Sequence, residues 1–303
     1  MIDKESILFK SGFIGIIGKP NAGKSTLMNF MVGEKVAITT RKPQTTRNRI
    51  MGIKNTEVGQ FIFLDTPGIH KAKTPLNRQM VSAAMSVFSD VNMLLLLVDA
   101  GTPIGEDDNF IVELLKKTKL PVVLVINKID LIDKEKLLLL IDNIKNIYTF
   151  KEIVPICALK GFNVDRLLDI IWNILPEGPQ YFPGDMITDR SERFLAAEII
   201  REKITILTHK EVPYSTAVIV ESFKENEAKG LIHIQAAINV EKDSQKGIII
   251  GKRGGMLKKI GTAARLEMEK FFSTRIYLEL FVKVQKDWSQ NPRMLGEFGY
   301  PNE

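Results

Sequence analysis

A single cysteine, Cys157, stands among the 303 residues, so an internal disulfide is excluded and the chain fits a reducing compartment. Long apolar runs are also missing. Residues 93–98 form one of the longest, and they fall well short of the roughly 18 residues that cross a bilayer. Asp3 and Glu5 interrupt the N-terminus, and the apolar run at residues 13–17 is too short for the core of a signal peptide. We therefore expect neither a membrane span nor secretion.

The composition is that of an ordinary folded protein. Apolar residues make up 45% and charged residues 26%, which argues against a disordered or collagen-like chain. The formal charge of +6 permits an anionic partner without requiring one. At roughly 150 residues per domain, the length predicts two domains.

The first half predicts an α/β domain. From residue 12 to about residue 175, short apolar runs such as FIGII, FIFLD, MLLLLVDA and PVVLVIN alternate with longer, helix-like stretches. This is the pattern of βα units around a mostly parallel sheet, whose central strands are buried on both faces.

A connector and a smaller module follow. Residues 175–190 contain three prolines and two glycines and break the periodicity. Beyond them, the order reads α-β-β-α-α-β, with a polar KENEA turn between the two first strands and a last strand that alternates from Ile276 to Val284. We predict a nucleotide-binding domain at residues 1–180, a linker at 181–190, and an α+β module with a C-terminal tail at 191–303.

The segment from Gly18 to Ser25 fits the G-x-x-x-x-G-K-[ST] phosphate-binding loop, directly after one apolar run and before a helix-like stretch. Its glycines let backbone N–H groups converge on phosphates, and the helix N-terminus adds positive charge. Lys24 is predicted to reach the β- and γ-phosphates, and the Ser25 hydroxyl to ligate Mg²⁺. The predicted phosphate-binding residues are Gly18, Asn21, Ala22, Gly23, Lys24, Ser25 and Thr26.

Two further elements complete the predicted phosphate and metal site. Asp65 follows the FIFL strand, so its carboxylate can hold Mg²⁺ through a water, while the Gly68 N–H senses the γ-phosphate. A threonine from the basic stretch 35–56, which we expect to be a mobile loop, should complete the Mg²⁺ shell. We choose Thr46, with Thr45 as its competitor. Lys24, Thr46 and Gly68 are the predicted catalytic residues.

Asn127, Lys128 and Asp130 follow the strand PVVLVI and predict a guanine site. The Asp130 carboxylate can accept from both N1–H and the 2-amino group, donors that adenine lacks, so GTP is preferred over ATP. Asn127 is expected to contact the base and tie neighbouring loops together, and Lys128 to pack along the ring. The backbone of Cys157, Ala158 and Leu159 should meet guanine O6.

These motifs, each after a strand and in this order, resemble those of the GTPases related to translation factors. Cys157 stands where that family usually has serine, and we take it as structural. Ile69 stands where Ras-like enzymes have the glutamine that orients water, so slow intrinsic turnover is expected. His70 is nearby, but a lone loop histidine is more often simply solvated. Asn21 resembles the asparagine that helps hold K⁺ in some relatives, which makes K⁺ a hypothetical second cation.

In the second module, the string from Gly247 to Gly255 contains Gly-Lys-Arg-Gly at 251–254, which matches the GXXG loop of a KH domain. Basic residues surround it without an acid from 245 to 266, as suits single-stranded RNA. The predicted RNA-binding residues are Ile248, Ile249, Gly251, Lys252, Arg253, Gly254, Lys258 and Lys259.

A GTPase domain followed by a type II KH domain resembles the Era family of bacterial ribosome-associated GTPases over essentially the whole chain. The resemblance implies binding near the 3′ end of small-subunit ribosomal RNA and action in maturation of the small ribosomal subunit. It also implies a cytoplasmic protein that associates peripherally with the inner face of the cell membrane. We expect a monomer that uses GTP and Mg²⁺. In our main interpretation, GTP orders the loop around Thr46, which favours RNA engagement.

Three alternatives remain open on the sequence. The chain could be a membrane-associated or tRNA-modifying GTPase whose second domain does not bind RNA. It could be an RNA-binding protein in which the nucleotide is only structural. It could also be an ATP-using P-loop kinase, which Asn127 and Asp130 disfavour.

Overall fold

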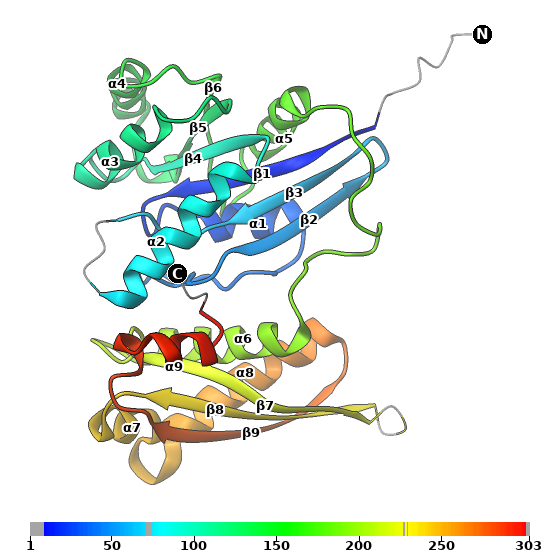
Figure 1. The fold of residues 1–303 in the computed structure, drawn as a ribbon, viewed down its shortest axis with the longest axis vertical. Helices are drawn as coiled ribbons and strands as arrows, with labels where there is room; N and C mark the ends of the chain where they lie inside the picture. Colours follow the sequence, from blue (N-terminus) through cyan, green and yellow to red (C-terminus); the bar gives the residue numbers. More distant parts are fainter. Residues whose placement is uncertain (1–8, 71–73, 227, 229, 301–303) are drawn as a thin grey trace. The chain divides into compact units, whose positions relative to one another are not determined.

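The computed structural model describes residues 9–70, 74–226, 228 and 230–300, and the chain divides into two compact units (Figure 1). As far as they are described, residues 1–37, 46–71 and 80–189 form the first unit. Residues 38–45, 72–79 and 190–303 form the second. The main division thus falls between Asp189 and Arg190. Two short segments of the first half, residues 38–45 and, as far as they are described, residues 72–79, group with the second unit.

Among its described residues, the first unit has a six-stranded sheet in the order β2-β3-β1-β4-β5-β6. All neighbouring strands are parallel except β2, which pairs antiparallel with β3. The strands are β1 (Lys10–Gly18), β2 (Ile50–Thr56), β3 (Gly59–Asp65), β4 (Met93–Asp99), β5 (Val122–Asn127) and β6 (Glu152–Pro155). The helices are α1 (Lys24–Val32), α2 (Pro75–Met85), α3 (Glu106–Leu115), α4 (Lys134–Lys145) and α5 (Val164–Ile174), with 3-10 turns η1 (Ser86–Ser89) and η2 (Ile129–Leu131).

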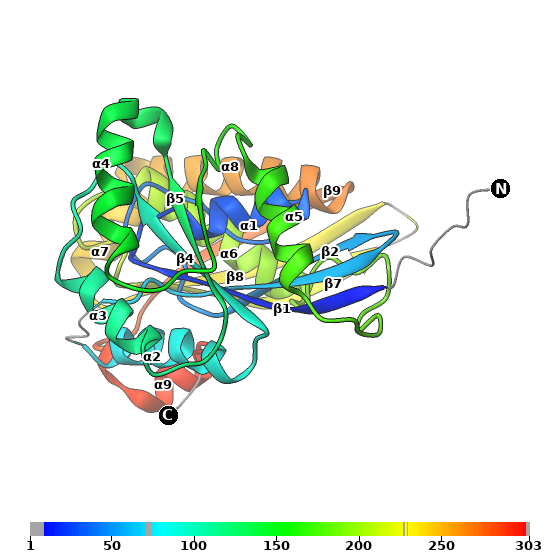
Figure 2. The ribbon, with the colours of Figure 1, turned by 90° about the horizontal axis from the view of Figure 1, so that it is seen from above.

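Both faces of this sheet are covered, which is why its central strands read as continuous apolar runs. Every residue of β3 and β5 is buried. Helices α1 and α5 lie on one face and α2 and α3 on the other (Figure 2). On the second face, Val87, Ile111 and Leu115 belong to one cluster with Leu96 and Leu124 of the sheet. The predicted α/β domain with a mostly parallel sheet is confirmed.

The edge strand β2 is a difference from the sequence prediction. The sequence predicts a mobile loop over residues 35–56, but its last seven residues form β2, which closes one side of the sheet. The connector then runs along this strand: Ile53 N donates to the Ile187 carbonyl at 2.8 Å, and Thr188 Oγ1 donates to the Met51 carbonyl at 2.7 Å. The Pro-rich connector is therefore hydrogen-bonded to the first unit up to its last residues.

The second unit has a three-stranded sheet in the order β7-β8-β9, with β7 and β8 antiparallel and β8 and β9 parallel, as far as the chain is described. Its elements follow the predicted order α-β-β-α-α-β and then add a short helix. They are α6 (Glu192–Leu207), β7 (Thr216–Asn226), β8 (Leu231–Val240), α7 (Asp243–Ile250), η4 (Lys252–Gly254), α8 (Gly255–Phe272), β9 (Arg275–Val284), η5 (Trp288–Gln290) and α9 (Pro292–Glu297).

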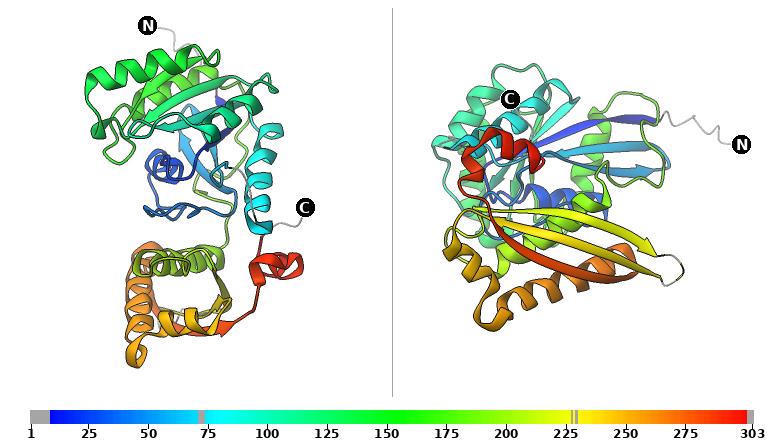
Figure 3. Two further views of the ribbon diagram at one scale, coloured as in Figure 1. Left: turned by 90° about the vertical axis from the view of Figure 1, so that its left-hand side faces the viewer. Right: turned by 60° about the horizontal axis from the view of Figure 1, so that its bottom comes forward.

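Helices α6 and α8 lie side by side along one face of this sheet (Figure 3). Ile200, Ile234 and Ile260 are fully buried between the helices and the sheet, and the alternating residues of β9 that include Ile276 pack on the same cluster. The C-terminal tail is anchored by Trp288, which is fully buried and donates from Nε1 to the Ser215 carbonyl at 3.0 Å. The second unit thus has the α-β-β-α-α-β order that the sequence predicts for a KH module.

Two details of the second unit differ from the sequence prediction. The sequence predicts a polar turn from Lys224 onward, but β7 continues to Asn226 because its pairing with β8 overrides the polar sequence. Helix α9 follows the strand that the sequence predicts as the last element, and the Asn291 side chain caps it. None of the described helices combines the length and the apolar character that crossing a bilayer requires.

Candidate functional site

The phosphate-binding loop lies between the end of β1 at Gly18 and the start of α1 at Lys24. Gly23 has φ +98°, and a Cβ there would lie 2.2 Å from Asn127 Nδ2, so only glycine fits. Asn21, also at positive φ, is exposed at the tip of the loop. The loop and the N-terminus of α1 therefore have the geometry of a cradle in which backbone N–H groups can bind an anion.

Lys24 is buried beneath this loop. Its Nζ donates to the carbonyl oxygens of Gly18 at 3.1 Å and Lys19 at 2.9 Å. Burial lowers the pKa of Lys24 to about 8, and the nearby Asp65 carboxylate opposes that shift. The ammonium group is thus held at the loop, where it can meet phosphate oxygens.

Three oxygen-bearing side chains converge beside Lys24. Ser25 Oγ donates to Asp65 Oδ2 at 2.5 Å, and Thr46 Oγ1 lies 2.8 Å from Ser25 Oγ. Thr45 does not reach this cluster, because its hydroxyl bonds to Thr40 Oγ1 at 2.6 Å and to the Lys42 carbonyl at 2.8 Å. Of the two threonines, only Thr46 is brought to Ser25.

Asp65 is fully buried at the end of β3, and its Oδ1 has no hydrogen-bond partner among the described residues. Burial raises the pKa of Asp65 to about 6, and Lys24 and Ser25 oppose the shift. The carboxylate is therefore ionised at neutral pH, and it presents an unsatisfied buried oxygen next to two hydroxyls. Such a donor set suits a hard, oxygen-preferring cation such as Mg²⁺.

The loop after Asp65 passes close to the phosphate-binding loop. A Cβ at Gly68 would lie 2.5 Å from Pro20 N, and Ile69 N donates to the Gly18 carbonyl at 3.1 Å. The Ile69 side chain is fully buried and has no polar atom. His70 Nδ1 lies 2.9 Å from the Gly68 carbonyl. The residue after Gly68, Ile69, therefore has no side-chain amide that could orient a water molecule.

The predicted base-binding residues meet at the ends of β5 and β6. Asn127 is buried and holds the Ala158 N–H at 2.9 Å, while Cys157 Sγ donates to Asp130 Oδ1 at 3.2 Å. This bond, followed by that of Lys160, lowers the pKa of Asp130. Cys157 is buried and its pKa is raised, first by burial and then by Asp130. It supports the carboxylate as a serine hydroxyl would, which fits a structural role.

Sequence reasoning missed two acidic partners of this region. Asp99 ends β4 and its Oδ2 lies 2.7 Å from Lys128 Nζ, and Asp108 at the start of α3 lies 2.6 Å from Lys19 Nζ. The sequence pattern that pointed to Asp65, a carboxylate at the end of an apolar strand, also points to Asp99. No local sequence pattern points to Asp108, because its partner Lys19 is distant in sequence.

In the second unit, the predicted basic loop joins α7 to α8. Gly251 has φ +70° and ψ 179°, a conformation that essentially only glycine adopts, and Gly254 has φ +75°. Lys252 and Arg253 are exposed between them, and Lys258 and Lys259, both also exposed, lie on the first turns of α8. The loop thus places a cluster of cationic side chains beside the glycine backbone at Gly251 and Gly254.

One predicted contact residue is corrected by its burial. Ile249 is fully buried in the core cluster of the second unit, so its side chain has no surface to offer to RNA. Its neighbour Ile248 is 45% exposed and remains available. The two differ because they point to different sides of α7.

Comparisons with known proteins agree with this arrangement. Residues 13–128 match the family model described as 50S ribosome-binding GTPase, and residues 211–289 match the KH domain model. The fold and site therefore define a GTPase with a C-terminal KH domain.

Relatives extend the match over the whole chain. GTPase Era of Syntrophus aciditrophicus is 65% identical over 295 residues, which are 97% of this chain and 96% of the relative. The solved structure of a point variant of Aquifex aeolicus Era bound to GDP·AlF4⁻ is 44% identical with a TM-score of 0.93, covering 96% of this chain and 99% of that one. A structure of Era in complex with MgGDPNP and nucleotides 1506–1542 of 16S ribosomal RNA gives the same identity, TM-score and coverage. The chain belongs to the Era family of GTPases.

Proposed function

We propose that this GTPase works as a molecular switch whose phosphate and Mg²⁺ site is formed by Lys24, Ser25, Thr46 and Asp65. The observation that carries the proposal is the convergence of Ser25 and Thr46 hydroxyls on the buried Asp65 carboxylate, one oxygen of which has no partner among the described residues. When bound, Mg²⁺ neutralises charge that develops on the phosphates. Asp65 would help hold the ion through a water molecule.

The other residues of the site bind and orient the nucleotide. Lys24 meets the β- and γ-phosphates, the Gly68 N–H senses the γ-phosphate, and Asp130 selects guanine. Because Ile69 cannot orient a water molecule, intrinsic hydrolysis is slow. Asn21, at the exposed tip of the loop, is the candidate to help hold K⁺ beside the phosphates.

The KH unit supplies the RNA-binding surface in this proposal. Lys252 and Arg253 clamp the backbone of single-stranded RNA, with Lys258, Lys259 and Ile248 beside them. The RNA is the 3′ end of small-subunit ribosomal RNA, in keeping with the related Era structure that holds nucleotides 1506–1542 of 16S rRNA. The GTP state favours this binding and hydrolysis releases it.

The cellular role follows from family membership. The protein acts in maturation of the small ribosomal subunit, as a monomer in the cytoplasm. Peripheral association with the inner membrane face is the further part of the proposal that rests on the family alone. Fractionation of cells before and after a high-salt wash of the membranes tests it.

The test of the main proposal measures how tightly the full-length protein binds a short RNA that copies the 3′ end of 16S rRNA. Affinity is determined with GDPNP and Mg²⁺ and again with GDP. We expect GDPNP to tighten binding several-fold, and the double variant Lys252→Ala, Arg253→Ala to abolish it. Equal binding in both nucleotide states would show that the RNA site is not gated.

A matched control separates loop contacts from general charge. The double variant Lys270→Ala, Lys286→Ala removes the same charge from two exposed positions outside residues 245–266. It should lower RNA affinity only slightly, since long-range attraction is screened within about 10 Å. If the protein binds no RNA at all, the KH unit has another partner and the tRNA-modifying or membrane-associated alternatives gain.

A further inference from the structure

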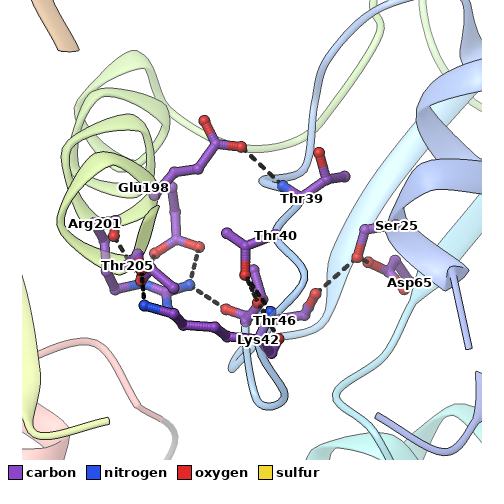
Figure 4. A network of polar contacts seen from close by, with 11 residues as sticks. Ser25, Thr39, Thr40, Lys42, Thr46, Asp65, Glu198, Arg201 and Thr205 are labelled. Atoms are coloured by element: carbon purple, nitrogen blue, oxygen red, sulfur yellow. Dashed lines mark hydrogen bonds and ion pairs between the residues drawn. The ribbon is translucent and has the colours of Figure 1, made fainter. Parts of the chain in front are cut away.

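Residues 38–45, which directly precede Thr46, contain no helix or strand, yet they are held firmly by helix α6 (Figure 4). Lys42 Nζ donates to the Thr205 carbonyl at 2.5 Å and also to the Thr208 carbonyl. These are carbonyl groups at the C-terminal end of α6, where a cation is stabilised by the helix dipole. The middle of the segment is therefore fastened to a helix of the second unit.

Both ends of the segment are fixed to the same helix. Thr39 N donates to Glu202 Oε1 at 2.9 Å, and Arg201 Nη2 donates to the Thr45 carbonyl oxygen. Arg201 and Glu202 are 3% and 1% exposed. These two end contacts are made to the backbone of the segment, so they fix the path of the chain at Thr39 and Thr45 whatever the side chains there are.

Arg201 is itself held in one orientation. Its Nε donates to Glu198 Oε1 and its Nη2 to Glu198 Oε2, both at 2.7 Å. This two-point pairing fixes the plane of the guanidinium, which has five N–H groups in a rigid fork. A remaining N–H of the same nitrogen then points at the Thr45 carbonyl.

The Thr45 carbonyl belongs to the peptide plane that includes the nitrogen of Thr46. Fixing this carbonyl therefore sets the direction in which the backbone enters Thr46, whose hydroxyl lies 2.8 Å from Ser25 Oγ. We propose that Arg201 is a positioning residue for the nucleotide switch: it holds the Thr45 carbonyl so that Thr46 is presented to the Mg²⁺ site. This inference rests on the proposed role of Thr46.

The effect is reciprocal by thermodynamic linkage. If holding the segment on α6 favours binding of the triphosphate with Mg²⁺, then binding of the triphosphate stabilises the segment on α6 by the same factor. The hydrogen bond from Arg201 to the Thr45 carbonyl thus couples nucleotide binding to helix α6. GDP has no γ-phosphate and does not need Thr46, so its affinity is independent of Arg201.

The test compares full-length wild type with Arg201→Leu in binding GDPNP and GDP, over a titration of Mg²⁺. We expect Arg201→Leu to weaken GDPNP binding roughly tenfold while GDP binding stays unchanged, since a hydrogen bond from a charged donor is lost. The Mg²⁺ concentration needed for GDPNP binding should rise in parallel. Lys283→Met, which breaks an ion pair with Glu221 elsewhere in the second unit, should change neither affinity.

A double-mutant cycle with Thr46→Val shows whether Arg201 acts through Thr46. In the Thr46→Val protein, Arg201→Leu should have no further effect on GDPNP binding. If Thr46→Val weakens GDPNP binding but Arg201→Leu does not, the positioning role is overturned and the proposed Mg²⁺ site stands. If Thr46→Val has no effect, the proposed role of Thr46 fails and the inference fails with it.

Stability is controlled separately, because Arg201→Leu leaves Glu198 without its partner. The double variant Glu198→Leu, Arg201→Leu removes both charges, and such paired replacements of buried ion pairs often preserve the fold. It should show the same selective loss of GDPNP affinity as Arg201→Leu. Wild-type GDPNP affinity in a folded double variant would overturn the proposal.

Discussion

Asn127 Nδ2 donates a hydrogen bond to the carbonyl oxygen of Ala22, 105 residues earlier in the chain, at 2.9 Å. The other end of the same amide accepts from Ala158 N at 2.9 Å. One buried side chain therefore ties the predicted phosphate-binding loop to the loop at Ala158 that is predicted to contact guanine. The sequence predicted that Asn127 ties neighbouring loops together, and its geometry explains how the two halves of a nucleotide site keep their spacing.

Asn127→Ala should lower the affinity for GTP and for GDP by a similar factor of at least roughly tenfold. The change leaves the Ala22 carbonyl and the Ala158 N–H unpaired and buried, at a cost of about 1–3 kcal/mol each. Calorimetric titration gives the affinities, and thermal unfolding gives the stability. Asn146→Ala, at an exposed position of the same domain, is the control and should change neither. A loss confined to GTP would contradict this explanation.

Asp130→Asn should change the base preference of the protein from guanine to xanthine. The amide can donate to the 2-oxo group of xanthine, whereas the wild-type carboxylate accepts from the two donors of guanine. We expect GTP affinity to fall roughly hundredfold, as the loss of two hydrogen bonds implies, and xanthosine triphosphate to bind instead. Asp133→Asn, the same change at an exposed neighbour, should keep the GTP preference. Retained GTP affinity in Asp130→Asn would place the base elsewhere.

The two glycines of the basic loop should differ in their response to alanine. A Cβ at Gly251 would lie 2.7 Å from Met256 Cβ and 2.9 Å from Met256 N, whereas a Cβ at Gly254 meets nothing within 4 Å. Gly251→Ala should therefore reshape the loop and lower RNA affinity by roughly tenfold or more. Gly254→Ala carries only the left-handed backbone strain of about 1–2 kcal/mol. Equal RNA affinity of the two variants would argue against a close backbone approach.

Turnover of GTP should be several-fold faster in K⁺ than in Na⁺ at equal ionic strength, if Asn21 helps hold K⁺ beside the phosphates. Phosphate release under single-turnover conditions measures the rate. Asn21→Ala should remove the difference between the two salts while the protein still binds GDP. Equal turnover of the wild-type protein in both salts would exclude the role of K⁺.

Much of the fold follows from local patterns. The strands that end at Asp65, Asp99 and Asn127 are short apolar runs, and parallel strands bring their carboxyl ends to one edge of the sheet. Polar residues placed after such runs must therefore gather there. The α/β domain was predictable for this reason, and the KH module from its element order and the GXXG loop at residues 251–254.

The rest depends on contacts between distant residues, which no local pattern encodes. Strand β2, with Lys54 and Asn55 inside it, is stabilised by pairing with β3 and by the connector. Arg201 and Glu202 look like solvated helix residues in the sequence, yet both are buried. Their partners, Thr45 and Thr39, lie 156 and 163 residues away along the chain.

The connector along β2 also decides how the molecule can be dissected. β2 is an edge strand, and a bare edge offers unpaired N–H and C=O groups on which other chains can add. The Ile187 carbonyl accepts a hydrogen bond from the Ile53 N–H of that edge. A fragment ending at Leu175 would lose this cover and become prone to aggregation, whereas one that extends to Asp189 keeps its own cap against intermolecular strand addition.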